Sequence, residues 1–379
     1  MELAIYREIK RIAVFRTVSS PQKIAWNFIK YNFPRPFSKP FLPRAMCIYV
    51  TYRCNMRCKM CGIWIQNSKY QSNELSLEEF DKILSDPLFS KLEFININGG
   101  EPNLRRDLVE IVKMFINKFP HLKTITLNTN GIPPEKTMEN VEKISTLCQR
   151  NKIRFSVSIS LHKIGKEYDK IAGIKNAYPK VREAFNGLKK INQNNKFYIS
   201  ANCVITNLNL FSLGKMLKWG AEEHIPINFT LGEIRDRFNN LDMKDNIEIK
   251  DENKDFLIKF LRILAKDKSL FNHHAFRYKV LADMIEFNKE RNISCHYAIG
   301  GLILGSEGSL FYCKDSKSIG NCRDQSAYSI YYDKKNLEDR GKKLLKGKCK
   351  KCPPNTFNRI EIEKDIIRYL IFLFKKKKI

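Results

Sequence analysis

Short apolar runs alternate with longer amphipathic segments from residue 46 to about residue 235. Short runs rich in β-branched residues predict strands, whereas apolar positions repeating about every 3.6 residues predict helices. Regular alternation of the two indicates parallel strands joined by crossover helices. The predicted strands cover residues 46–51, 92–98, 123–128, 153–160, 197–205 and 226–231. The first predicted helix starts at Ser76, and the later ones cover residues 105–119, 135–150, 177–194 and 208–223.

This pattern predicts an α/β fold, a partial (β/α)6 barrel whose ligands bind at the carboxyl ends of the strands. The first crossover helix has a recognisable start, because Ser76 and Glu79 form the sequence of a capping box. The predicted domains are a helical and extended lead-in at 1–45, the barrel at 46–235, a helical connector at 236–294, a small cysteine-rich domain at 295–355 and an apolar-basic helix at 356–379.

Two terminal segments carry apolar residues next to basic ones. Ile5, Ile9 and Ile12 fall at helical spacing, which suits either docking on the barrel or lying on a membrane surface. Ile366 to Phe374 is nearly all apolar and precedes four lysines. That run is too short to span a bilayer, so it predicts either a packed terminal helix or a peripheral membrane contact.

The chain has 379 residues and a formal net charge of +28. Such a field attracts nucleic acid, anionic lipid or a phosphorylated substrate, but the codon bias of an AT-rich genome explains the same lysine excess. No RNA-binding motif is present, so nucleic acid is not the favoured partner. The first twenty residues are too charged for a secretory signal, which predicts a cytoplasmic protein with reduced thiols.

Three cysteines, Cys54, Cys58 and Cys61, follow the first predicted strand with the spacing Cys-x3-Cys-x2-Cys. Thiolates are the usual ligands of iron-sulfur clusters, most of which take four. A cubane held by three leaves one iron open to a substrate or cofactor. The spacing alone also fits most of a zinc site completed by a distant residue.

The second predicted strand runs into Asn98-Gly99-Gly100-Glu101-Pro102, where two glycines allow close approach to the backbone. With the cysteine motif at the end of the preceding strand, this sequence resembles the radical S-adenosylmethionine (SAM) superfamily. The resemblance implies a SAM-binding 4Fe-4S cluster on the three cysteines and a cofactor site that includes Gly99, Gly100, Glu101 and Pro102.

Further cofactor contacts are implied by the same resemblance. Glu101 resembles the acidic residue that receives the SAM ammonium group. Because it follows two glycines at a strand end, we expect it to have no core to serve, that is, no structural role in the protein interior. Asn130 stands in a Thr-Asn-Gly turn, and Ser158 and Ser160 share one face of the fourth strand, where they contact SAM or satisfy neighbouring backbone. Met60 replaces an aromatic residue that relatives use to stack on adenine.

A second group of cysteines lies near the end of the chain. Cys295, Cys313, Cys349 and Cys352, with a hairpin at Gly305 to Gly308 and an Ile319-Gly320-Asn321 turn, resemble the twitch/SPASM-like domain. This resemblance implies an auxiliary 4Fe-4S cluster with four ligands and leaves Cys322 unassigned; a four-cysteine zinc ribbon is the alternative. Cys47, Cys148 and Cys203 are expected to be small buried hydrophobes.

The resemblance implies a radical SAM oxidoreductase that cleaves SAM to a 5'-deoxyadenosyl radical and abstracts hydrogen from a substrate. A reductant such as flavodoxin or ferredoxin would supply the electron. An auxiliary cluster with no open iron favours oxidation or crosslinking of a peptide, a sugar, or a cell-surface glycan or lipid precursor. An iron-sulfur protein that binds or modifies RNA is the alternative, and no catalytic acid or base can be assigned.

Overall fold

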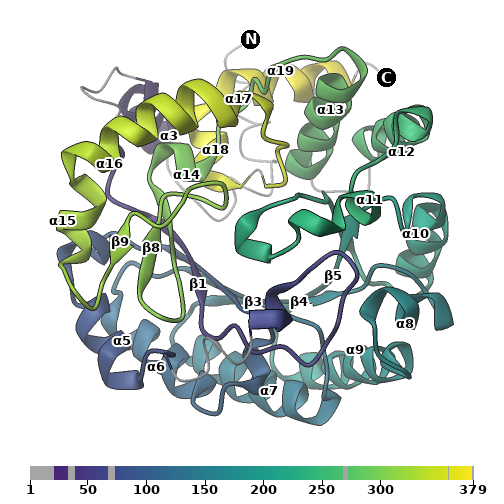
Figure 1. Ribbon diagram of the computed structural model, residues 1–379, viewed down its shortest axis with the longest axis horizontal. Helices are drawn as coiled ribbons and strands as arrows, with labels where there is room; N and C mark the ends of the chain where they lie inside the picture. Colours follow the sequence, from purple (N-terminus) through teal and green to yellow (C-terminus); the bar gives the residue numbers. More distant parts are fainter. Residues whose placement is uncertain (1–20, 33–38, 67–72, 268–271, 357, 378–379) are drawn as a thin grey trace.

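The computed structural model describes residues 21–32, 39–66, 73–267, 272–356 and 358–377. At its centre lies one sheet of nine strands, curled into an open barrel, in the order β6-β5-β4-β3-β2-β1-β7-β8-β9 (Figure 1). The first six strands are parallel to their neighbours, which confirms the predicted α/β barrel. They are β1 (Ala45–Tyr49), β2 (Phe94–Asn98), β3 (Thr124–Thr129), β4 (Arg154–Ser160), β5 (Tyr198–Ile205) and β6 (Ile227–Leu231).

An outer layer of helices covers the convex side of these strands (Figure 1). Apolar side chains on alternate strand positions, such as Ile125 and Val157, are fully buried against this layer. The predicted capping box is present at the first helix, where Ser76 and Glu79 each bond the other's backbone amide. The layer consists of α5 (Leu77–Leu84), α6 (Leu108–Lys118), α7 (Pro134–Arg150), α8 (Lys166–Ala172), α9 (Ala177–Asn194) and α10 (Leu213–Glu222).

The inner face of the barrel is polar. Thr126 and Ser156 bond through their hydroxyls at 2.8 Å, and Asn228 donates to the side-chain oxygen of Asn202 at 3.2 Å. Strand alternation also puts Ser158 and Ser160 on the face of Ser156, as predicted. The barrel interior is therefore suited to hydrogen-bonding a ligand.

The cysteine-rich segment continues the barrel sheet. β7 (Gly301–Leu304) pairs in parallel with β1, and β8 (Ser309–Phe311) and β9 (Gly320–Asn321) add antiparallel strands. The predicted hairpin joins β7 to β8. The expected turn at Ile319-Gly320-Asn321 is wrong in part, because Gly320 and Asn321 form β9.

The remaining helices lie over one end and side of the barrel (Figure 1). In the predicted connector Phe260 and Leu264 are buried, but Ile263 is 61% exposed, so only part of the expected packing stripe packs. The predicted N-terminal helix with Ile5, Ile9 and Ile12 lies outside the described residues. The helices are α3 (Pro21–Asn32), α11 (Lys244–Ile247), α12 (Lys254–Lys266), α13 (Asn272–Glu286), α14 (His296–Ile299), α15 (Ala327–Tyr332), α16 (Lys334–Asp339), α17 (Cys349–Lys351), α18 (Arg359–Lys364) and α19 (Ile366–Lys377), with a π-helix at Arg340–Lys348.

Candidate functional site

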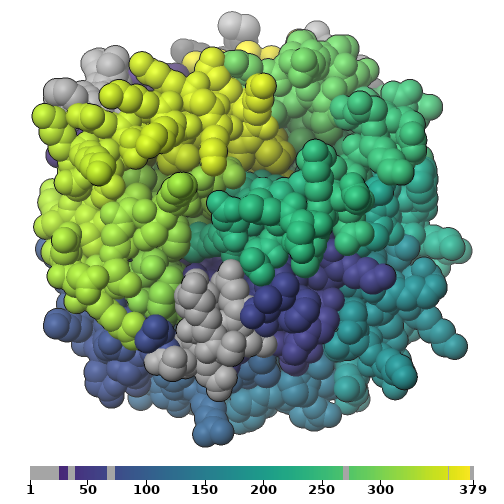
Figure 2. Space-filling view, in the orientation of Figure 1, coloured from purple at the N-terminus to yellow at the C-terminus, as the bar shows by residue number. Residues whose placement is uncertain are grey.

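The loop that carries Cys54, Cys58 and Cys61 follows β1 and reaches the centre of the face shown in Figure 2. Burial raises the pKa of all three thiols, that of Cys54 to about 12. Ionisation of Cys58 is opposed further by the nearby Cys54 and Cys61. A bound metal would favour joint deprotonation of these partly buried thiols, because a metal binds the thiolate form.

Gly99 and Gly100 lie directly against this loop. The amide of Gly100 donates to the Thr51 carbonyl at 2.9 Å, and the next amide donates to the Arg53 carbonyl at 2.7 Å. A Cβ atom on Gly99 would stand 2.4 Å from the Thr51 oxygen, and one on Gly100 would stand 2.2 Å from the Arg53 oxygen. The close approach that these glycines permit is therefore made by the cysteine loop itself.

A second brace comes from the end of α8, to which the sequence assigned no role. The amides of Arg57 and Lys59 donate to the carbonyls of Ala172 and Ile171 at 2.9 and 3.0 Å. Gly173 ends the helix with a φ of 70°, and a Cβ atom there would lie 2.2 Å from the Arg57 oxygen. The glycine itself was the signal available in the sequence, since glycine commonly ends helices in the left-handed conformation.

A third brace is the segment 236–246, named here the strap. The Gly62 amide donates to the Phe238 carbonyl at 2.8 Å, and the Asn240 side chain donates to the Met60 carbonyl at 3.0 Å. The Asn246 side chain donates to the Lys59 carbonyl at 2.9 Å. The strap thus fixes the backbone on both sides of the third cysteine, a role that its charged, helical sequence pattern did not indicate.

Glu101 is completely buried, and the expectation that it has no core to serve is wrong. Its carboxylate accepts bonds from the Asn103 backbone and side chain, from the Thr129 hydroxyl at 2.7 Å and from the Asn130 amide at 2.6 Å. Burial raises the pKa of this carboxyl, although the hydrogen bonds that it accepts act to lower that pKa. Glu101 therefore ties the turn after β2, which begins at the buried Pro102, to the end of β3. A contact with the SAM ammonium stays a prediction.

Asn130 lies next to the first cysteine. Its side-chain amide donates to the Asn55 oxygen at 2.8 Å and lies 4.0 Å from the Cys54 sulfur, while its own oxygen accepts from the Ile132 amide. Hydrogen bonds to ligand sulfurs help to set the reduction potential of an iron-sulfur cluster. The structure thus brings Asn130 to the cysteine loop; its contact with SAM stays a prediction.

Met60 is 8% exposed and packs with Ile171 and Ile247 in an apolar cluster that also touches Cys58. An apolar surface beside the second cysteine is the environment that a purine face requires. Ser158 and Ser160 are half-buried on the inner face of β4. These three assignments stay predictions.

The late cysteines form a second group. Burial raises the pKa of Cys313, Cys349 and Cys352, and Cys295 adds to the rise in each of them, so these four thiols lie close together. The pKa of Cys322 is raised by burial and by the charge of Asp86, with no contribution from Cys295 among its causes. The structure therefore gathers the four residues that the sequence pattern selected and leaves Cys322 apart. Cys47, Cys148 and Cys203 are buried, as predicted.

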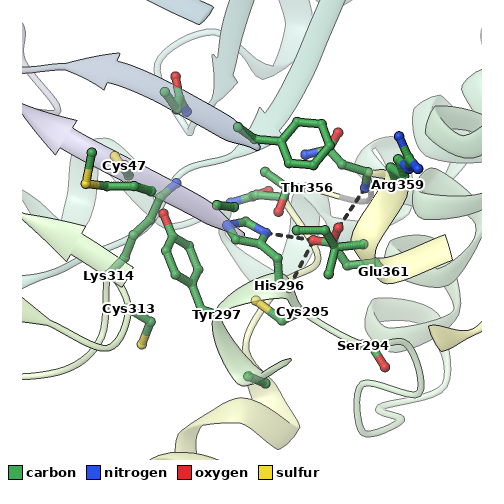
Figure 3. A pocket seen from close by; sticks show the side chains of 18 of the residues that line it. Cys47, Ser294, Cys295, His296, Tyr297, Cys313, Lys314, Thr356, Arg359 and Glu361 are labelled. Carbon is green, nitrogen blue, oxygen red and sulfur yellow. Dashed lines mark hydrogen bonds and ion pairs between the residues drawn. The ribbon is translucent and has the colours of Figure 1, made fainter. Parts of the chain in front are cut away.

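A cavity of about 1080 Å³ extends from these cysteines to the amino ends of the barrel strands, including Ala45, Phe94 and Thr124 (Figure 3). The sequence placed ligands only at the opposite, carboxyl ends. Beside Cys295, the ring of His296 lies 2.7 Å from the Glu361 carboxylate. Although burial opposes ionisation, His296 helps to hold the pKa of Glu361 at about 2.

Among the residues that the structure describes, no three Cys, His, Asp or Glu side chains converge closely enough to hold a single metal ion. Such convergence would be expected of a preformed zinc site with four ligands. A polynuclear cluster spaces its thiolates more widely, because each sulfur binds a different iron. The two cysteine groups, one of three and one of four, are partly buried, and an iron-sulfur cluster or zinc at the second group stays a prediction.

Comparison with known proteins gives one family. The model of the Radical SAM superfamily matches residues 48–219. The PqqA peptide cyclase of Bradyrhizobium diazoefficiens is 26% identical over 177 residues, 47% of this chain and 43% of that protein. The GTP 3',8-cyclase of Synechocystis sp. is 33% identical over 120 residues, 31% of this chain and 33% of that protein. The chain therefore spans less than half the length of these curated relatives in the matched region.

Among solved structures, native anSMEcpe with bound AdoMet and the Cp18Cys peptide has a TM-score of 0.54 to this chain. The likeness covers 89% of this chain and 100% of that one, at 17% sequence identity. It shows a shared fold over both the barrel and the cysteine-rich segment.

Proposed function

The chain belongs to the radical SAM superfamily, and on this premise we propose that it cleaves SAM reductively and uses the 5'-deoxyadenosyl radical to abstract hydrogen from a substrate. The observation that carries the proposal is the loop of Cys54, Cys58 and Cys61, held at the carboxyl edge of the sheet by three separate braces. A 4Fe-4S cluster bound there would supply the electron that splits SAM.

The chain's own residues would position the cofactor. The turn at Gly99 and Gly100 presents backbone groups beside the cysteine loop, and Glu101 keeps that turn rigid. Ser158 and Ser160 would bond SAM from the inner face of β4, and the apolar cluster of Met60 would pack against adenine. A rigid, dry site of this kind orients the reacting carbon and excludes water.

We further propose that Cys295, Cys313, Cys349 and Cys352 hold an auxiliary 4Fe-4S cluster. Four protein ligands leave no open iron, so a substrate is not bound there directly. Such a site would instead receive the electron lost when the substrate radical is oxidised, with flavodoxin or ferredoxin as the external reductant. This favours dehydrogenation or crosslinking over isomerisation.

A peptide is the substrate class that we propose. One relative is named a peptide cyclase, and the structural neighbour was solved with a peptide bound. The polar interior of the barrel and the large cavity beside the late cysteines support a substrate that enters as an extended chain. Sugars, glycan or lipid precursors and RNA are the competing classes.

The central test is replacement of Cys54, Cys58 and Cys61 together by alanine. Reconstituted wild-type protein should bind about eight iron and eight sulfide per chain and form 5'-deoxyadenosine when reduced. The triple variant should keep about half of the iron and form no 5'-deoxyadenosine. SAM cleavage by the variant at the wild-type rate would overturn the proposal.

A peripheral membrane contact is a second proposal, carried by an exposed row on α19. Ile367, Ile371 and Phe374 are 55%, 50% and 48% exposed, whereas Tyr369 on the opposite side is buried. Within the described ranges, none of the helices has the length and apolar character needed to cross a bilayer. The row and its neighbouring lysines would lie in the interface of an anionic membrane.

Flotation with anionic vesicles tests this contact. Full-length protein should float, whereas a triple variant with serine at Ile367, Ile371 and Phe374 should stay in solution with an unchanged unfolding temperature. Equal flotation of the two proteins, or none by either, would rule out the membrane contact. Lys378, one of the four lysines, lies outside the described residues.

A further inference from the structure

Arg237 in the strap has an unusual environment for a buried cation. Its guanidinium lies against two aromatic rings, 4.5 Å from the centroid of Tyr49 and 4.0 Å from that of Phe311. All three of its nitrogens are shielded from solvent, and none has a well-oriented acceptor among the described residues. The Tyr52 hydroxyl interacts with this guanidinium as a neutral hydrogen-bond partner, so what Arg237 lacks among the described residues is a carboxylate.

Other buried arginines of this protein are compensated. Arg235, two residues away, pairs with Glu233 and Asp315. Arg277 donates to the carbonyls of Asn355 and Phe229 and to the Asn228 side chain. A buried charge without such partners is costly and calls for an anion. Arg237 therefore differs from structural arginines of the same chain.

The position of Arg237 indicates which anion it serves. Its neighbour Phe238 bonds Gly62, which follows Cys61, and Phe311 stands two residues before Cys313. Tyr49 is the last residue of β1. Arg237 therefore lies between the three-cysteine loop and the hairpin that carries Cys313, where a substrate held between the two proposed clusters would pass.

We propose that Arg237 binds an oxyanion of the substrate, a carboxylate or a phosphate. The two rings lie within 4.5 Å of the guanidinium carbon, so a ligand that approaches in the plane of the guanidinium is best placed for bidentate hydrogen bonding. Because the nitrogens are closed to water, binding must shift the strap. This inference rests on the proposed function for the identity of the ligand, but not for the anion site itself.

The strongest competing explanation is an internal ion pair. Glu307 lies near Tyr52, and one of its carboxylate oxygens is buried without a partner. A small movement would let Glu307 neutralise Arg237 without any ligand. The two explanations predict different effects of removing either charge.

The experiment follows the unfolding temperature of reconstituted protein, without SAM or reductant, in acetate, inorganic phosphate or chloride at constant ionic strength. A specific site gives a saturable rise above chloride, and the anion with the larger rise identifies the carboxylate or phosphate source. Arg237→Met should abolish the rise and, in chloride, melt no lower than wild type. Arg237→Lys, which keeps the charge without the planar fork, should show less than half of it.

Glu307→Gln should keep the rise at its wild-type size. The proposal is overturned if wild type shows no saturable rise, if Arg237→Met retains it, or if both single variants melt several degrees lower in chloride, as loss of an internal pair requires. These measurements use no SAM chemistry, so a failure of SAM cleavage remains distinguishable from a failure of the anion site.

Discussion

Gly173→Ala tests whether the end of α8 holds the three-cysteine loop in place. An alanine at a φ of 70° costs about 1–2 kcal/mol, because its Cβ crowds the following carbonyl. The new Cβ would also stand 2.2 Å from the Arg57 oxygen, so the loop must move away. That movement breaks the two hydrogen bonds that the backbone amides of Arg57 and Lys59 donate to α8, each worth about 1 kcal/mol net. The expected loss is therefore about 3–4 kcal/mol, concentrated at the loop.

The assay combines denaturant unfolding with iron analysis after anaerobic reconstitution. Gly173→Ala should lose about half of its iron, because the second cysteine group is untouched, and should form little 5'-deoxyadenosine. Gly165→Ala is the matched control at the other end of α8. Its φ of 68° and ψ of −154° strain an alanine at least as much as the left-handed backbone of Gly173, but nothing lies within 4 Å of the new Cβ, so strain is present without a clash at the cysteine loop. Gly165→Ala should keep full iron whatever its stability, and if Gly173→Ala also keeps full iron, the loop does not depend on this brace.

Two further predictions concern the cysteines and the scaffold. Cys322→Ala should leave the iron content unchanged, whereas Cys295→Ala should lower it by about half; the reverse result in iron analysis would mean that the named ligand set is wrong. Changing Cys349 and Cys352 to alanine should spare SAM cleavage but reduce substrate product, and equal product from the variant would refute an electron-accepting role. Although burial works to raise it, salt bridges from Arg44 and Lys123 hold the pKa of Glu93 at about 2, below its usual 4.5. The resulting stabilisation is complete above pH 4.5 and is lost as the pH falls toward 2, so wild type should lose about 1–2 kcal/mol more than Glu93→Gln between pH 5 and pH 3, after allowing for solvent screening. Equal losses in urea unfolding at these two pH values would contradict this assignment.

Local patterns were sufficient to predict most of the barrel. The apolar period of α9 predicts its observed bounds, and alternation along β4 predicts which serines share a face. These features depend on residues a few positions apart. The fold class has the same origin, whereas the grouping of Cys295, Cys313, Cys349 and Cys352 came from the family resemblance.

The braces of the cysteine loop could not be predicted in this way. They consist largely of backbone bonds between segments far apart in sequence, and such bonds leave no side-chain pattern. Only glycines such as Gly62 and Gly173 mark the places where two distant segments of the backbone come into contact. Glu101 was misjudged for a related reason, because its partners Thr129 and Asn130 lie at the end of another strand, β3, and directly after it.

The pairing of β1 with β7 has a consequence for synthesis of the chain. Ala45 lies opposite Gly301, so about 250 further residues must be synthesised after β1 before its second neighbouring strand, β7, is available for pairing. At roughly 5–20 residues per second, the edge of β1 stays open on the ribosome for tens of seconds. An unpaired apolar edge such as Met46 to Tyr49 is prone to pair with other chains during that time. Production at low temperature or with a chaperone that shields strand edges should therefore raise the yield of folded protein more than any change at the cysteines.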